Sequence, residues 1–189
     1  MTYIEIFGML SALLYLYFSI KQNIFLWPLG IITSALYIYV FFVSKFYADM
    51  GLQVYYLVIS IYGWYYWIYG KKKETGKLPV TVLNFKLWVL SLIAIAVLFL
   101  FIVFILKKFT DSELPYWDSF TTSASIVATW MLAKKKIDNW LLWIVVDSVS
   151  AGLYWHKELY VTFVLFIVYT TMAVVGYIQW RKTMSVQDE

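Results

Sequence analysis

The chain has no cysteine and a single histidine, His156, among its 189 residues. The missing thiols exclude disulfides, thiolate nucleophiles and zinc–thiolate sites, and one imidazole excludes any site that needs two. Charged residues are also scarce, at 14% against about a quarter in a soluble domain. Phosphate-binding glycine loops, nucleophile elbows and paired metal motifs are missing too. These absences argue against an enzyme and against a bound metal or cofactor.

The chain is instead rich in apolar residues: 63% of it is hydrophobic and 22% is aromatic. A transmembrane helix needs about 20 such residues. Seven apolar stretches meet that length, and the connectors between them leave no room for an extramembrane catalytic domain. The sequence therefore predicts an all-α integral membrane protein whose seven transmembrane helices cover residues 3–20, 25–43, 50–69, 83–106, 116–133, 139–155 and 159–180.

The basic residues predict how the chain is oriented. Alternating the connectors between the two sides puts 11 of the 15 Lys and Arg residues on one side and four on the other. By the positive-inside rule, the carboxyl terminus is cytoplasmic and the amino terminus external. We interpret the basic runs as topology signals with some attraction for anionic lipids, and not as a nucleic-acid site. The majority side holds Lys21, Lys71, Lys72, Lys73, Lys77, Lys86, Lys134, Lys135, Lys136, Arg181 and Lys182, and the other side holds Lys45, Lys107, Lys108 and Lys157.

An internal repeat divides the chain. An offset of 113 residues aligns 3–67 with 116–180 without a gap, and 12 of the 65 paired positions are identical, including Trp27/Trp140, Gly63/Gly176 and Trp67/Trp180. About five identities are expected from so biased a composition. Two parallel three-helix repeats with one connecting helix, a 3+1+3 layout, are predicted. The expected divisions are 1–69 for the first repeat, 70–113 for the linker and fourth helix, 114–182 for the second repeat, and 183–189 for a cytoplasmic tail.

Asp147 lies deep in the sixth predicted span, where a carboxylate is costly unless it is paired or reaches water. Trp140, Trp143 and Asp147 fall at i, i+3 and i+7 and so share one helical face. Two indoles and a carboxylate suit a flat cationic ring through stacking, cation–π attraction and charge. The alternative is that the tryptophans serve packing or the membrane interface and that Asp147 is hydrogen-bonded to a neighbouring helix.

Three residues of the third and seventh spans complete the candidate set. Gln53 needs partners for its amide within a membrane, and a substrate can supply one. Tyr56 and Tyr169 occupy matched positions of the two repeats, where substrate contact and interhelical hydrogen bonding are both open. In parallel-repeat transporters the substrate lies near mid-membrane between the repeats.

Four segments of this chain, 53–56, 61–67, 116–118 and 139–147, resemble the PnuC family of bacterial vitamin transporters. The resemblance extends over nearly the whole chain, and it maps the family's Trp-x-x-Trp-x-x-x-Asn/Asp motif onto Trp140, Trp143 and Asp147 and its glutamine onto Gln53. In the family members associated with nicotinamide riboside, the residue at the position that matches 147 is an asparagine. This chain has an aspartate there.

The resemblance implies a fold like that of full-length SWEET sugar transporters, homotrimers in the bacterial inner membrane, and facilitated diffusion of a non-phosphorylated vitamin. It also implies that a cytoplasmic kinase traps the vitamin and that no ion gradient is needed. Because of Asp147 we favour the cation thiamine slightly over the cation nicotinamide riboside, with neutral riboflavin third. A SWEET-like sugar facilitator and a non-transporting membrane scaffold remain alternatives.

Overall fold

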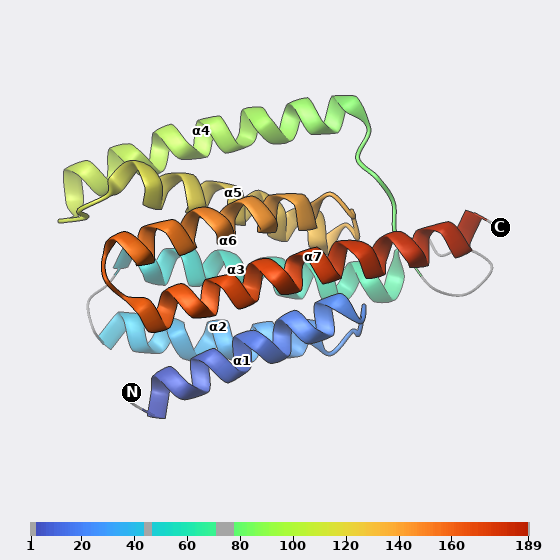
Figure 1. Ribbon diagram of the computed structural model, residues 1–189, viewed down its shortest axis with the longest axis horizontal. Coiled ribbons are helices and arrows are strands. Elements are labelled where there is room, and N and C mark those ends of the chain that lie inside the picture. The colour runs from blue at the N-terminus through green and yellow to red at the C-terminus, as the bar shows by residue number, and fades with distance from the viewer. Residues whose placement is uncertain (1–2, 44–46, 71–77, 189) are drawn as a thin grey trace. The chain divides into compact units, whose positions relative to one another are not determined.

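The computed structural model describes residues 3–43, 47–70 and 78–188, and it describes no side chains for 3–8, 47–49 and 186–188. The topology charges Lys45, Lys71, Lys72, Lys73 and Lys77 lie outside the described residues. Within them the chain is helical, and Figure 1 shows the order of its elements. The helices are α1 (Tyr3–Ile20), α2 (Leu26–Val43), α3 (Tyr47–Tyr69), α4 (Phe85–Phe109), α5 (Pro115–Ala133), α6 (Asn139–His156) and α7 (Tyr160–Asp188).

The helix lengths suit a bilayer. At 1.5 Å per residue, even the 18-residue helices are about 27 Å long, close to the hydrocarbon thickness. Three stretches, Leu26–Val43, Phe85–Phe109 and Tyr160–Ser185, are long and apolar enough by composition alone to be called spans. The seven predicted helices are confirmed to within a few residues at most ends. The exception is α7, which continues to Asp188, beyond its expected end at residue 180. Residues 181–188 contain no glycine or proline that would stop the helix.

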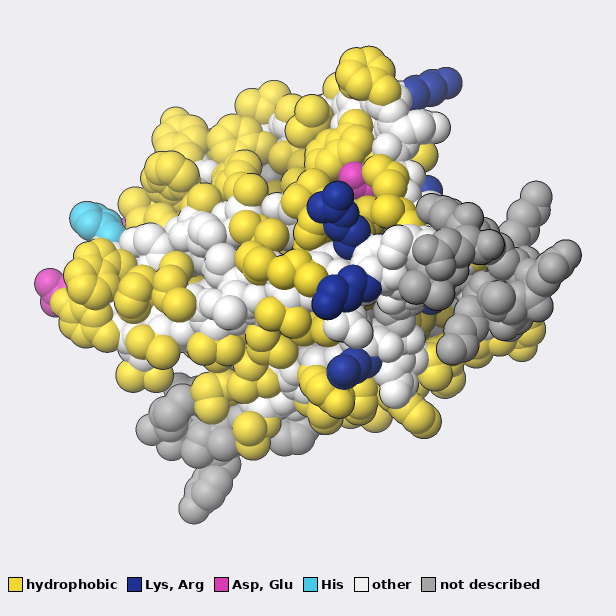
Figure 2. Space-filling model, turned by 45° about the vertical axis from the view of Figure 1, so that its right-hand side comes forward, with side chains coloured by type: hydrophobic (Ala, Val, Ile, Leu, Met, Phe, Trp, Pro, Cys, Tyr) yellow, Lys and Arg dark blue, Asp and Glu magenta, His cyan; other side chains and the backbone are white. Residues whose placement is uncertain are grey.

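Large hydrophobic side chains cover much of the surface. Figure 2 shows hydrophobic side chains exposed over most of the visible face. On α4, for example, Val97, Leu100 and Phe101 are each exposed by more than half. Water would penalise such a surface, at roughly 25 cal/mol per Å². Lipid chains impose no such penalty, so the exposed apolar faces are consistent with a multi-pass membrane protein.

The residues form two compact units, which we describe separately. The first comprises residues 1–79 with 133–135. In it α1 packs on α2 and α2 on α3. Its centre is Trp27, which is fully buried against Gly63 and meets Trp67 edge to face, with ring centroids 5.4 Å apart. Glycine on α3 is what lets the α2 indole come so close to the α3 backbone.

The second unit comprises residues 80–132 and 136–189 and includes α4. Leu83, Val127 and Met131 form a buried cluster against which Leu87 and Trp88 pack, so that α4 lies on α5. Side by side in Figure 1, α6 and α7 form the other part of this unit. Their contact repeats the arrangement of the first unit, with Trp140 packed on Gly176 and edge to face with Trp180 at 5.7 Å.

The turns that enter α2 and α6 also match. Gln22 and Lys135, paired by the offset of 113, have φ values of 53° and 55°. In both turns the next residue's backbone N–H donates to the carbonyl five residues earlier at 2.9 Å, the closure of a Schellman motif. The two paired turns therefore share their backbone conformation and hydrogen bonding, and the two units share their tryptophan packing.

Lys135 differs from an ordinary connector lysine. Its side chain is 6% exposed, its ammonium donates to the Leu78 carbonyl at 2.9 Å, and it lies 4.8 Å from the Trp67 ring centroid. Lys134 lies over the rings of Tyr62 and Tyr66. From the sequence, Lys134 and Lys135 of the α5–α6 turn are interpreted only as topology signals. In the structure they also stabilise the first unit through cation–π contacts with α3.

Asp138 fixes the start of α4. One carboxylate oxygen accepts the backbone N–H of Leu83 at 2.7 Å, and the other accepts the Trp88 indole N–H at 3.0 Å. The side chain is 4% exposed, so both bonds lie out of water. Asn84 then caps α4 by accepting the Leu87 N–H. Asp138, a connector residue for which the sequence predicts no role, thus links the start of α4 to the start of α6.

We expect Asp138→Asn to destabilise the protein, because the amide that replaces one oxygen repels one of the two N–H donors. A hydrogen bond to a charged group contributes roughly 1.5 kcal/mol. Thermal unfolding in detergent should show this loss, whereas Asp111→Asn in the exposed loop before α5 should be neutral. Equal midpoints for the two variants would contradict the anchoring role of Asp138.

Candidate functional site

The predicted face of α6 exists, and it is longer than expected. At 100° per residue, Trp140, Trp143, Asp147 and Tyr154 fall within an arc of about 60° on α6. This stripe faces α7, because Trp140 packs on Gly176 and Tyr154 stacks on Phe166. Tyr154, which the sequence analysis did not select, lies two turns beyond Asp147 on the same face.

Asp147 is buried, with 7% of its surface exposed. Among the residues described, its carboxylate has no hydrogen bond or ion pair, which is uncommon for a buried acid. Its repeat mate, Ser34 on α2, is also buried but is neutral. The second unit therefore presents a carboxylate that a cationic ligand can satisfy, at a place where the first unit has only a hydroxyl.

The two tryptophans of the motif have different surroundings. Trp140 is 1% exposed and packed between Gly176 and Trp180, so its ring is already in contact within the second unit. Its indole N–H has no acceptor in the described part of the chain, as is also true of Trp27. Trp143 is half-buried, and it is the indole of the motif with surface left for a ligand.

Tyr169 belongs to an aromatic series that joins α7 to α6. Tyr154 stacks on Phe166 with ring centroids 5.1 Å apart and an interplanar angle of 20°. Phe166 in turn meets Tyr169 edge to face at 5.5 Å and 77°. Both geometries are favourable for aromatic pairs. The sequence signal that could have found Tyr154 is its i+7 spacing from Asp147.

Gln53 and Tyr56 lie on α3 and so belong to the first unit. Both side chains are half-buried, and the ring of Tyr56 is tilted against Tyr55 at 5.6 Å. Gln53 makes no hydrogen bond among the described residues. Trp140, Trp143 and Asp147 thus share one face of α6, and Tyr169 lies on α7, the helix packed against α6. A single site formed by these residues with Gln53 and Tyr56 stays a prediction.

The matched position in the first unit is closed. Gly30 on α2 is the repeat mate of Trp143, and a Cβ at Gly30 would lie 2.8 Å from Ser60 Oγ and 3.2 Å from a Tyr15 ring carbon. The two halves of the repeat therefore differ where the candidate site lies. One half has a large indole and a carboxylate, and the other has a glycine covered by a tyrosine and a serine.

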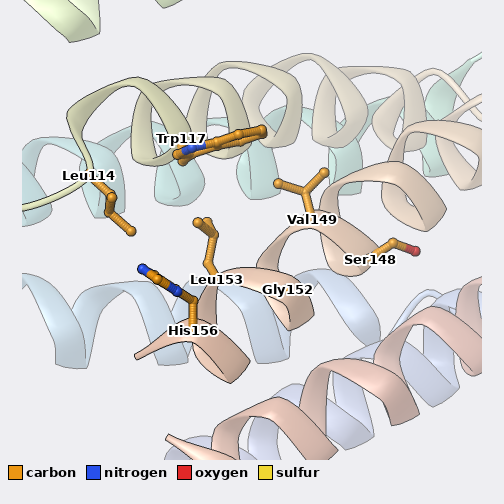
Figure 3. Close-up of a pocket in the computed structure, with 7 residues that line it drawn as sticks. All are labelled: Leu114, Trp117, Ser148, Val149, Gly152, Leu153 and His156. Atoms are coloured by element: carbon orange, nitrogen blue, oxygen red, sulfur yellow. The ribbon is translucent and has the colours of Figure 1, made fainter. Parts of the chain in front are cut away.

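A pocket of about 420 Å³ lies between α5 and α6 in the second unit. Leu114, just before α5, and Trp117, in the first turn of α5, line one side, and the remaining lining residues come from α6 (Figure 3). These α6 residues lie on the helical face away from Trp143 and Asp147; they are Ser148, Val149, Gly152, Leu153 and His156. This apolar pocket is therefore separate from the predicted site. Among the described residues, no group of three or more His, Asp or Glu could hold a metal ion.

These features define a class first: a multi-pass helical membrane protein with a buried carboxylate on α6. The chain belongs to the Nicotinamide mononucleotide transporter family, whose family model matches residues 2–182. The membership expected from the sequence resemblance to the PnuC family is thereby confirmed.

Relatives of known function are similar over almost the whole chain. The nicotinamide riboside transporter PnuC of Escherichia coli (strain K12) is 25% identical over 204 residues, covering 95% of this chain and 85% of the relative. The riboflavin/roseoflavin transporter RibM of Streptomyces davaonensis is 23% identical, covering 93% and 83%. The crystal structure of the vitamin B3 transporter PnuC matches with a TM-score of 0.71 at 26% identity, covering 94% of this chain and 80% of that one.

Proposed function

We propose that this chain is a facilitative transporter that imports a non-phosphorylated, cationic B vitamin across the bacterial inner membrane. The observation that carries the proposal is Asp147, a buried carboxylate without a partner in the described residues, on the same α6 face as the half-buried indole of Trp143. An unpaired carboxylate within a bilayer is costly. A bound cationic ring offsets that cost and gains cation–π attraction from the indole.

Nicotinamide riboside is the vitamin that we place first. It and thiamine are both cations, so Asp147 suits either one. The sequence alone ordered thiamine first because of the departure at position 147, but a relative named for nicotinamide riboside is 25% identical over nearly the whole chain. Riboflavin is neutral and gains nothing from a carboxylate, although RibM is a relative. We therefore propose riboside, then thiamine, then riboflavin.

The transport cycle follows from the repeat. We propose a 3+1+3 arrangement of parallel repeats in which Trp143, Asp147, Tyr169, Gln53 and Tyr56 contact the vitamin. Trp140, which is packed on Gly176 and Trp180, supports the α6 face that carries Trp143 and Asp147. Rocking of the repeats then gives alternating access. We further propose homotrimers, an external amino terminus, a cytoplasmic carboxyl terminus, and trapping of the vitamin by a cytoplasmic kinase, so that uptake persists when the proton gradient is dissipated.

Titration of purified protein with nicotinamide riboside, thiamine and riboflavin, followed by tryptophan fluorescence, tests the proposal. We expect saturable quenching by one cationic vitamin, because it stacks on Trp143, and much weaker quenching in Trp143→Phe. Proteoliposomes then show whether the bound vitamin is carried. Saturable binding without flux would indicate a scaffold or sensor, and competition by sugars would favour a sugar facilitator. Quenching by none of the three vitamins would reject the proposal.

A further inference from the structure

The contact between α6 and α7 has an aromatic layer at each end. At one end Trp140 packs on Gly176 and Trp180. At the other end Tyr154 stacks on Phe166. Asp147 lies midway along α6, seven residues from Trp140 and seven from Tyr154, which is about 10.5 Å along the helix axis in each direction. The unpaired carboxylate is therefore bracketed by two aromatic layers on a single helical face.

The two layers differ in how much surface they leave free. Trp140 and Trp180 are 1% and 0% exposed, so that layer is filled by the protein itself. Tyr154 is half-buried, and the stack with Phe166 covers one face of its ring. The edge contact of Phe166 with Tyr169 fixes the orientation of the stack. The Tyr154 layer can thus accept a further group, whereas the Trp140 layer cannot do so without repacking.

The Tyr154 and Phe166 stack has no aromatic counterpart between the matched positions of α2 and α3. The repeat mate of Tyr154 is Phe41 on α2, and that of Phe166 is Gln53 on α3, which has no ring. Phe41 stacks on Tyr37 of its own helix at 5.8 Å. Trp27, Gly63 and Trp67 nevertheless reproduce the other layer almost unchanged. The tryptophan layer is therefore common to both units, whereas the second unit adds a stacked aromatic pair beside its carboxylate.

We propose that Tyr154 is a substrate-contacting residue that holds the second ring of a two-ring cationic vitamin, and that Phe166 is the residue that positions it. The cationic ring pairs with Asp147, and the ribose of nicotinamide riboside, or the pyrimidine of thiamine, lies against Tyr154. Side chains of a helix lean toward its amino-terminal end, so the Tyr154 ring extends back toward Asp147 and one ligand can contact both residues. This inference rests on the proposed function and deepens it, because it assigns the two ends of the ligand to different residues.

A cation that lacks the second ring of the vitamin allows the contacts of the two ends of the ligand to be tested separately. 1-Methylnicotinamide keeps the pyridinium charge of nicotinamide riboside and lacks the ribose. We expect Tyr154→Ala to weaken the Kd for the riboside about tenfold, or about 1.4 kcal/mol, and to leave that for 1-methylnicotinamide unchanged. Asp147→Ala should weaken both. If thiamine is the vitamin that the wild type binds, thiamine and a 3-methylthiazolium cation take the same places in the comparison.

Matched variants keep the test decisive. Phe41→Ala removes the equivalent ring of the first unit and should leave both affinities unchanged. Tyr154→Leu keeps bulk without a π face and should behave as Tyr154→Ala does. Phe166→Ala should weaken riboside binding, and Phe166→Tyr, which preserves the stack, should restore it. Riboside affinity within about twofold of wild type in both Tyr154 variants, with Asp147→Ala still impaired, overturns this inference alone. An unimpaired Asp147→Ala overturns the proposed function instead.

Discussion

Asp147→Ala is expected to abolish saturable uptake of the cationic vitamin while leaving the protein folded in the membrane. The change removes the charge of the side chain and both of its acceptor oxygens. Loss of one partner of a buried, hydrogen-bonded charge pair costs about 2 to 5 kcal/mol, which is a Kd at least about thirtyfold weaker. Uptake of labelled vitamin into cells or proteoliposomes, with a binding titration of the purified variant, measures both effects. Trp143→Ala should reduce binding in the same assays.

Two comparisons make this result specific. Ser34→Ala changes the matched position of the first unit, which is also buried, and should leave uptake close to wild type. Neutral riboflavin gains nothing from the carboxylate, so any binding of riboflavin should be equal in wild type and Asp147→Ala. Wild-type uptake of a cationic vitamin by Asp147→Ala would remove the proposed role of the carboxylate.

Gly176→Val should strongly destabilise the second unit. A Cβ at Gly176 would already lie 2.6 Å from ring carbons of Trp140, which is 1% exposed and cannot move aside. Overpacking of a filled core costs about 1 to 3 kcal/mol and occasionally more. We expect Gly176→Ala to lower the thermal midpoint in detergent by several degrees and Gly176→Val to lower it further. Because Trp140, Trp143 and Asp147 share a face, binding should weaken as well.

Glycines in open positions provide the control. A Cβ at Gly51 or Gly152 meets no atom within 4 Å, and alanine is favoured over glycine within a helix by up to about 1 kcal/mol. Gly51→Ala and Gly152→Ala should therefore leave stability unchanged or raise it. Trp140→Phe, with its smaller ring, should recover part of the loss in Gly176→Ala, since the two residues are in contact. A midpoint for Gly176→Ala equal to that of Gly152→Ala would refute the close-packing explanation.

Helix content and the repeat could be predicted because both are properties of single segments. An apolar stretch of about 20 residues predicts a span without knowledge of its neighbours. Pairs such as Trp27/Trp140 show the duplication at fixed spacing, and the matched turns at Gln22 and Lys135 agree with it. Asp147 stands out for a similar reason, since its cost in a membrane depends on its depth in one helix.

Which residues meet across helices could not be predicted, because that depends on the register between segments far apart in the chain. The sequence offers Trp140 as a ligand residue, and the structure buries it on Gly176. Asp138 and Lys135 read as connector charges, yet each is buried and satisfied by groups more than 50 residues away. The Tyr154 and Phe166 stack, likewise, exists only once α6 lies on α7.

The sequence by itself determined a membrane protein of seven helices, its duplication, its family resemblance and the carboxylate on which the proposed function rests. Only the tertiary structure decided which aromatic side chains are buried in contacts between helices and which keep surface that a ligand can contact. The physical reason is that hydrophobicity and helical periodicity act along one segment, whereas side-chain burial and pairing are set by the surfaces that separate segments present to each other.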